Sequence, residues 1–121
     1  HDALPISMIK GSFKRTGSGR IVSFELTGHA EAGPYGSDVV CAAVSALAIS
    51  TVNGIDALAG FEPIVEVDDV EGGYLYVEML TTVNQEQKNI AQILLENLLL
   101  GLQSIENENT EFIQIKTITE K

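Results

Sequence analysis

The sequence predicts an α+β domain with the element order ββαββαβ, in which a mostly antiparallel sheet packs with two helices. Two pairs of apolar-patterned segments are each joined by a glycine-containing turn, which is typical of β-hairpins. Two longer apolar segments have the length and spacing of helices. Strands and helices do not alternate singly along the chain, so a doubly wound parallel sheet is not expected.

Residues 8–15 and 21–27 form the first predicted hairpin. Its second strand, IVSFELT, alternates apolar and polar side chains, as a strand with one buried face does. The segment TGSG between the two strands is expected to turn, because its glycines tolerate positive φ.

A helix is predicted from about residue 38 to residue 58. Asp38 is the expected N-cap and Gly60 the expected stop. The segment is apolar nearly all round and rich in small residues, so we expect a central helix that is largely covered.

The segments PIVEVDDV and GYLYVEML predict a second hairpin around Glu71-Gly72-Gly73. We expect Val65 and Val67 to face the core with the apolar residues of the following strand, which are Leu75, Val77 and Met79. The other side of this hairpin should be acidic, with Glu66, Asp68, Glu71 and Glu78.

A second helix is predicted from about Asn84 to Glu106, and TEFIQIKTI forms the last strand. The apolar surface of this helix is wider than one stripe. Either two sides of the helix are buried within one chain, or the sheet covers one side and a second subunit the other. The sequence does not favour one of these interpretations. The apolar residues concerned are Ile90, Ile93, Leu94, Leu95, Leu98, Leu99, Leu100, Leu102 and Ile105.

The chain has 121 residues, enough for one domain. Its first seven residues, HDALPIS, do not read like the rest, so we expect residues 1–7 to be a vector-derived remnant and residues 8–121 to be the single domain. With 17 acidic and 7 basic residues the net charge is −10, which disfavours direct binding of nucleic acid. No uninterrupted apolar run reaches the roughly 18 residues of a membrane span, so we expect a cytoplasmic protein without membrane contact.

The stretch GHAEAGPYGSDVVCAA contains Cys41, the single cysteine, and His29, the single histidine after residue 1. A lone cysteine in an apolar helix is most often an inert small hydrophobe, and a lone loop histidine is most often solvated. With Asp38 as N-cap, however, Cys41 is in the first helical turn, where free N–H groups and the helix dipole favour a thiolate. Imidazole is a base that can activate a thiol near neutral pH. The pattern therefore predicts a Cys–His active site.

Two further residues have alternative interpretations. Asp38 either caps the helix or orients His29, and the two roles are compatible. Ser45 lies one helical turn after Cys41, where it either lines the site or donates back to a helix carbonyl. One cysteine cannot build a disulfide or a cysteine-rich zinc site, and the chain has no phosphate-loop or HExxH motif, so no metal or cofactor is expected.

These residues resemble the ribosomal-processing cysteine protease family, often called Prp. The resemblance extends over residues 8–118, and the His, Cys and Asp positions show no departure from the family pattern. The matching motif consists of Gly28-His29-Ala30, Gly33, Gly36, Asp38, Val40-Cys41-Ala42 and Ser45-Ala46.

The resemblance implies a cysteine endopeptidase with a Cys/His pair. Such enzymes remove a short N-terminal extension from a basic large-subunit ribosomal protein, cleave after an aromatic residue, form homodimers and close a glycine-containing loop over the substrate. The alternative is a non-catalytic ribosome-biogenesis module that holds a basic ribosomal protein on its acidic face, with Cys41 buried. In the enzyme, the substrate-binding loop would include Ala30, Gly33, Tyr35, Gly36 and Ser37.

Overall fold

The computed structural model describes residues 8–29, 37–68 and 73–120. Its elements follow the predicted order, with one added turn of π-helix, η1, directly after the first helix. The elements are β1 (Ile9–Arg15), β2 (Ile21–Thr27), α1 (Ser37–Gly54), η1 (Ile55–Ala59), β3 (Ile64–Asp68), β4 (Tyr74–Glu78), α2 (Gln85–Glu108) and β5 (Ile113–Thr119).

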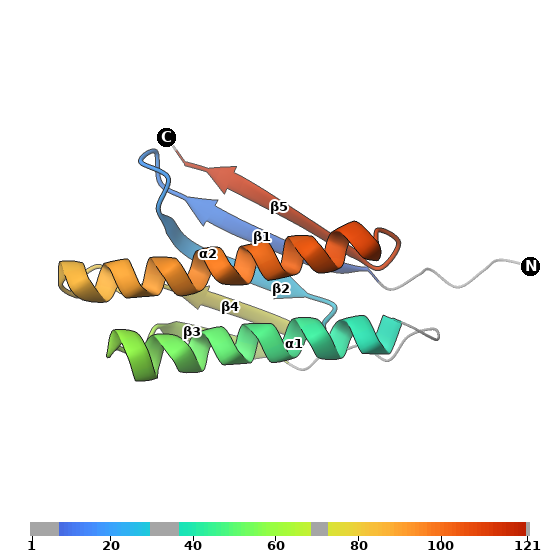
Figure 1. Ribbon diagram of the computed structural model, residues 1–121, viewed down its shortest axis with the longest axis horizontal. Coiled ribbons are helices and arrows are strands. Elements are labelled where there is room, and N and C mark those ends of the chain that lie inside the picture. The colour runs from blue at the N-terminus through green and yellow to red at the C-terminus, as the bar shows by residue number, and fades with distance from the viewer. Residues whose placement is uncertain (1–7, 30–36, 69–72, 121) are drawn as a thin grey trace, which may run out of the picture.

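The five strands form one sheet in the order β3-β4-β2-β1-β5. Every neighbouring pair is antiparallel except β1 and β5, which are parallel. Figure 1 shows α1 and α2 side by side across one face of this sheet. The predicted α+β fold with a mostly antiparallel sheet and two helices is therefore confirmed.

The core lies between the sheet and the two helices. At its centre the rings of Phe13 and Phe24, on paired strands, stack with centroids 5.4 Å apart, and both side chains are buried. Buried leucines on the side of α2 that faces the sheet complete this core. They are Leu95, Leu98, Leu99 and Leu102.

The predicted end of the first helix and the predicted start of the second are observed with small changes. Gly60 ends η1 with φ +80° and donates its N–H to the Ile55 carbonyl at 3.1 Å. Asn84 caps α2, because its side chain accepts from the Gln87 N–H while the Gln87 side chain accepts from the Asn84 N–H.

The burial predicted for β3 is wrong. Val65 and Val67 face the same side of the sheet as the buried residues of β4, but they are 42% and 70% exposed. All five residues of β3 are exposed, because β3 is an edge strand and the packing between helices and sheet does not extend over it.

The expectation that α1 is largely covered is also wrong. Both helices lie in one layer, so the side of α1 that faces away from the sheet, including Val39 and Ile49, is exposed. The continuous helix Ser37–Ala59, α1 with η1, is long and apolar enough to cross a membrane by length and composition alone, with a mean hydropathy of 1.6 over an 18-residue window. Its buried residues pack in the core of the α/β layer, as those of a core helix in a globular domain do.

For α2, burial on two sides within one chain is likewise not observed. Ile93 and Leu100 point away from the sheet and are 69% and 63% exposed. An apolar strip on the outer side of α2 is therefore open in the single chain.

Arg15 at the end of β1 forms an ion pair with Glu96 on α2, with two hydrogen bonds between the guanidinium and the carboxylate. The hydrogen bond from Arg15, together with its positive charge, lowers the pKa of Glu96 below its usual 4.5. The pair is half exposed, so its contribution to stability is under about 1 kcal/mol.

Because the pKa of Glu96 is depressed in the folded state, this stabilisation is present above pH 4.5 and is lost as pH falls below that value. We expect Glu96→Gln to lower the free energy of unfolding at pH 7 and to make little difference at pH 3. Urea denaturation of both proteins at the two pH values measures this. An equal difference at both values would show that the charge of Glu96 does not matter.

Candidate active site

The site begins where β2 ends. Gly28 follows the last residue of β2, has φ +81° and donates its N–H to the Gly73 carbonyl at 3.1 Å. A Cβ at this position would lie 2.7 Å from the backbone oxygen of Met8, so the fold requires glycine here. This glycine sets the direction in which His29 leaves the sheet. The sequence did not predict this structural role of Gly28. The available signal was a glycine directly after a predicted strand.

Cys41 lies in the second turn of α1 and faces this strand end. Its side chain is buried, with 7% exposed, and its S–H donates to the Gly28 carbonyl oxygen at 3.7 Å. The sulfur is therefore next to the peptide group that precedes His29. The contact brings Cys41 to the segment that carries His29, and the pairing of the thiol with the imidazole stays a prediction.

Ser45 makes a second contact between α1 and the same segment. It is one helical turn after Cys41, and its hydroxyl donates to the His29 carbonyl oxygen at 3.2 Å. The Ser45 hydroxyl therefore bonds to the segment of His29 and not back to a carbonyl of its own helix. Two adjacent carbonyls, of Gly28 and His29, thus each accept from one face of α1.

His29 is partly buried, and its Nδ1 atom is shielded from solvent. The structure brings His29, Cys41 and Ser45 to one corner of the fold, between the end of β2 and the second and third turns of α1.

The predicted cap geometry of Asp38 is wrong. The helix begins at Ser37, so Asp38 is within the first turn and Cys41 is the fifth residue of α1. The Asp38 carboxylate accepts from the N–H of the next residue, Val39, at 2.9 Å, and not from residue 40 or 41. Because the four free N–H groups of a helix belong to its first four residues, the N–H of Cys41 is not one of them. Any effect of the helix terminus on the sulfur is weaker than predicted.

Most of the predicted substrate-binding loop lies outside the described residues. This applies to Ala30, Gly33, Tyr35 and Gly36. Ser37, the last residue of that loop, is the first residue of α1 and is buried.

The contact of Cys41 Sγ with the Gly28 carbonyl oxygen suits a thiol, which can donate its proton to that oxygen. A thiolate cannot donate, and a carbonyl oxygen would repel its charge. Formation of the nucleophile therefore requires a base at this corner and loss of the bond to Gly28. Among the residues that the structure describes, no group of three or more His, Cys, Asp or Glu side chains could hold a metal ion.

The open face of the sheet is acidic on the side of β4 and β3. The predicted positions of Glu66, Asp68 and Glu78 on one face are confirmed by the register, and Glu71 lies outside the described residues. Glu25 joins this face from β2.

Two tyrosines of β4 are hydrogen-bonded to these carboxylates. Burial and the neighbouring Glu25 raise the pKa of Tyr74, and the hydrogen bond to Glu78 at 2.6 Å raises the pKa of Tyr76. Both tyrosines are therefore neutral near pH 7.

Ser45→Ala removes the hydroxyl that holds the His29 carbonyl. Since one such hydrogen bond contributes about 0.5–1.5 kcal/mol, we expect peptide cleavage to fall about 3- to 10-fold while the fold is retained. The matched control is Ser104→Ala, because the Ser104 hydroxyl donates to the Leu100 carbonyl of its own helix. Equal rates for both variants would contradict a positioning role for Ser45.

A family model described as "Cysteine protease Prp" matches residues 8–114 of the chain. The chain belongs to the Prp cysteine protease family. Membership covers the whole described α+β domain up to β5, and it makes the chain a cysteine protease.

Relatives of this Prp chain carry matching names. The Bacillus subtilis protein "Ribosomal processing cysteine protease Prp" is 36% identical over 110 residues, which are 91% of this chain and 97% of the relative. The protein of that name from Staphylococcus aureus strain Mu50 is 37% identical over 97 residues, 80% of this chain and 87% of the relative.

Solved structures have the same fold. A Streptococcus mutans protein superposes with a TM-score of 0.86 at 38% identity, covering 94% of this chain and 97% of its own. The S. aureus Prp in complex with a substrate peptide gives 0.80 at 31% identity, with 91% and 99% covered. The S. aureus enzyme with a covalently linked product peptide gives 0.76 at 34% identity, with the same two shares covered.

Proposed function

We propose that this chain is a cytoplasmic cysteine endopeptidase that removes a short N-terminal extension from a large-subunit ribosomal protein. One observation carries the proposal. In a chain that matches the Prp model over residues 8–114, the Cys41 thiol lies against the Gly28–His29 segment. Cys41 is the nucleophile and His29 the base.

The reaction uses the proton that Cys41 now donates to Gly28. His29 takes this proton, and the thiolate attacks the carbonyl carbon of the scissile peptide bond. The tetrahedral intermediate collapses when His29 returns the proton to the leaving amine, which leaves a thioester on Cys41. A water that gives its proton to His29 then attacks the thioester and releases the acid product and the thiol.

The oxyanion of the intermediate requires N–H donors. The N–H groups of the first turn of α1 lie at this corner, and among them the Val39 N–H donates to the Asp38 carboxylate. We therefore assign the oxyanion to N–H groups of the first helical turn. The Asp38 carboxylate accepts a hydrogen bond from one of these donors, the Val39 N–H. That Asp38 also orients His29 is a separate prediction.

The charge of the sheet supports a basic substrate. Asp68, Tyr74 and Thr27 are at the end of the open sheet face that adjoins Gly28 and Gly73. A cationic peptide leaving the site across this face would meet the carboxylates of Glu25, Glu66 and Asp68.

Incubation with the extended and the mature-length ribosomal protein tests the function. Mass spectrometry should show one cut in the extended form, after an aromatic residue, and none in the mature form. Binding of the extended form without cleavage would favour the non-catalytic binding module instead.

We further propose that the chain forms a homodimer through the outer side of α2. Ile93 and Leu100 give this side an apolar strip that the single chain leaves exposed. Burial of such a strip by a second copy would account for the width of the apolar surface of the helix.

Leu100→Glu is expected to give a monomer in light scattering at micromolar concentration, where the parent chain is a dimer. The control is Ile118→Glu, which introduces the same charge on β5 at a side chain that is 43% exposed. This variant should leave the dimer intact. A dimer in both variants would place the interface elsewhere.

A further inference from the structure

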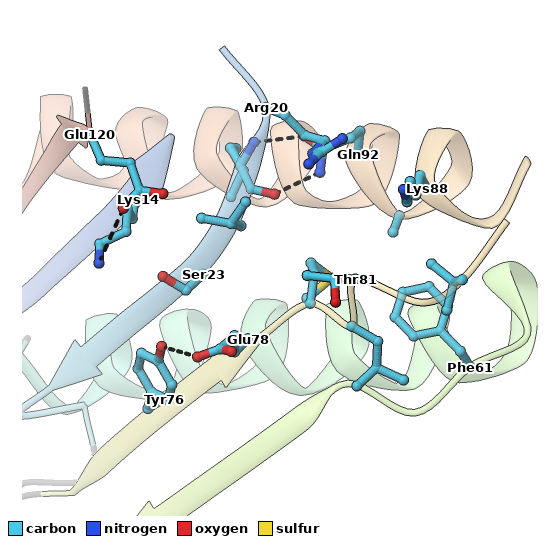
Figure 2. A pocket seen from close by; sticks show the side chains of 16 residues that line it. Lys14, Arg20, Ser23, Phe61, Tyr76, Glu78, Thr81, Lys88, Gln92 and Glu120 are labelled. Carbon is cyan, nitrogen blue, oxygen red and sulfur yellow. Dashed lines mark hydrogen bonds and ion pairs between the residues drawn. The ribbon is translucent and has the colours of Figure 1, made fainter. Parts of the chain in front are cut away.

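A cavity of about 310 Å³ lies at the end of the sheet that is opposite the site of Cys41 (Figure 2). Its lining includes Ile21 and Ser23, at the start of β2, while Gly28 follows the end of the same strand. Seven residues of strand separate these ends by about 20 Å. The cavity is therefore distinct from the peptidase site.

The cavity exists because β4 leaves β2 at this point. The register between the two strands ends at Ser23 and Glu78, followed by one bond from the Met79 N–H to the Val22 carbonyl. The next residue, Ile21, is bonded instead by the side-chain amide of Gln92. Its N–H donates to Gln92 Oε1 at 2.8 Å, and its carbonyl accepts from Gln92 Nε2 at 2.6 Å (Figure 2). The Gln92 side chain thus takes the place of a neighbouring strand and keeps the space beside it open.

One wall of the cavity is apolar. It is formed by residues from β2, from the segment after η1, from the segment after β4 and from α2. These are Ile21, Phe61, Leu80, Val83 and Ala91, and three of them, Ile21, Phe61 and Ala91, are buried. The volume is at the lower end of the range for pockets that hold small ligands.

The charged groups at the cavity differ from the rest of the chain. Three of the seven basic residues, Lys14, Arg20 and Lys88, line it, although the chain has a net charge of −10. Two carboxylates also line it, so the lining has three basic and two acidic side chains; Glu120 lies 3.8 Å from Lys14, and Glu78 accepts from the neutral Tyr76 hydroxyl.

The other two cations have no such partner. Within residues 8–29, 37–68 and 73–120, neither the Arg20 nor the Lys88 side chain makes a hydrogen bond or an ion pair. Two cations that are not neutralised therefore stand beside an apolar wall. An anionic group can be paired there while an attached apolar group is removed from water.

We propose that this cavity binds a small amphipathic anion, with one carboxylate or phosphate head group on an apolar body of about the size of a bicyclic ring. The head group pairs with Arg20 and Lys88, and the apolar body lies against Phe61 and Val83. The proposal is independent of the peptidase reaction and does not require Cys41.

Binding of 2-naphthoate, followed by ¹H–¹⁵N NMR of the labelled protein, tests the proposal. We expect saturable shifts at Ile21, Val22 and the Gln92 side-chain amide, with none at Cys41 or Ser45. The neutral isostere 2-naphthamide should bind at least tenfold more weakly. Comparison of 2-naphthoate with 2-naphthyl phosphate shows which head group is preferred. Equal binding of the acid and the amide, or shifts centred on another surface, would overturn the proposal.

Charge-reversal variants locate the head group. Lys88→Glu and Arg20→Glu should each weaken 2-naphthoate binding at least tenfold. Lys10→Glu is the matched control, because Lys10 is exposed on β1 and does not line the cavity, and it should change affinity less than twofold. If a reversal variant does not fold, the Lys88→Gln and Arg20→Gln variants replace it, with a loss of at least threefold expected. The Cys41→Ala protein should bind like the parent, so this result is independent of the outcome for peptide cleavage.

Discussion

Replacement of Cys41 by alanine is expected to lower kcat/KM for cleavage of an extended ribosomal-protein N-terminus by at least about a thousandfold. The thiol lies at the corner of Gly28 and His29, where it is placed to form the acyl intermediate, and the chain has no second cysteine to replace it. Because Cys41 is buried, the loss must be separated from a folding defect. Cys41→Ser keeps a hydroxyl in the same position and should also be inactive.

Product masses and thermal denaturation of both variants provide the measurement. Inactive proteins with near-parental unfolding temperatures would assign the nucleophile. Iodoacetamide labelling near pH 7 gives a second test, since Cys41 is the single thiol and its labelling should slow when His29 is replaced by alanine. If Cys41→Ala still cleaved the extended protein, the nucleophile would be another residue.

Gly28→Ala is expected to have the largest effect on stability near the site. Alanine at φ +81° costs about 1–2 kcal/mol, and the added Cβ would be 2.7 Å from the Met8 carbonyl oxygen. Because that neighbour is backbone of the adjacent chain segment, relief of the contact adds about 1–3 kcal/mol. We expect a total loss of about 2–5 kcal/mol in urea denaturation, a large part of the stability of a small domain. Cleavage should also be lost, because the Gly28 carbonyl and His29 would move relative to α1.

The chain offers a matched control in Gly19. It has φ +94°, but a Cβ there would have nothing within 4 Å, so Gly19→Ala isolates the cost of the backbone conformation. We expect about 1–2 kcal/mol for this variant and no change in cleavage. If both variants lose the same free energy of unfolding, the segment around Met8 moves to accept the added Cβ. Close packing would then not be what fixes Gly28 in place.

Local patterns in the sequence predicted the elements well. The alternation in IVSFELT placed β2, the predicted stop at Gly60 lies at the end of η1, and the predicted start near Asn84 lies at the N-cap of α2. The same patterns did not predict the exposure of Val65 and Val67. Alternation states which side of a strand a residue is on, but whether a helix covers that side depends on the position of the strand in the sheet.

The site could be predicted in part. The relation of Cys41 to Ser45 follows from helical spacing alone, whereas their contacts with Gly28 and His29 depend on how α1 packs against the end of β2. The helix begins two residues earlier than a cap at Asp38 predicts, which is enough to move Cys41 from the third to the fifth residue of the helix. The cavity beside Gln92 had no signal in the sequence, because it results from the departure of one strand and a single side-chain amide.

The parallel pairing of β1 with β5 has a consequence for how the protein is made. Ile9 pairs with Ile113, so the two strands are 104 positions apart in the chain (113 − 9), and β1 is the first strand to leave the ribosome. Until β5 has been synthesised and has emerged, β1 has β2 on one side and an unpaired edge on the other. The sheet is therefore completed only after translation of its last strand, and closing this long-range contact is expected to be the slow step of folding.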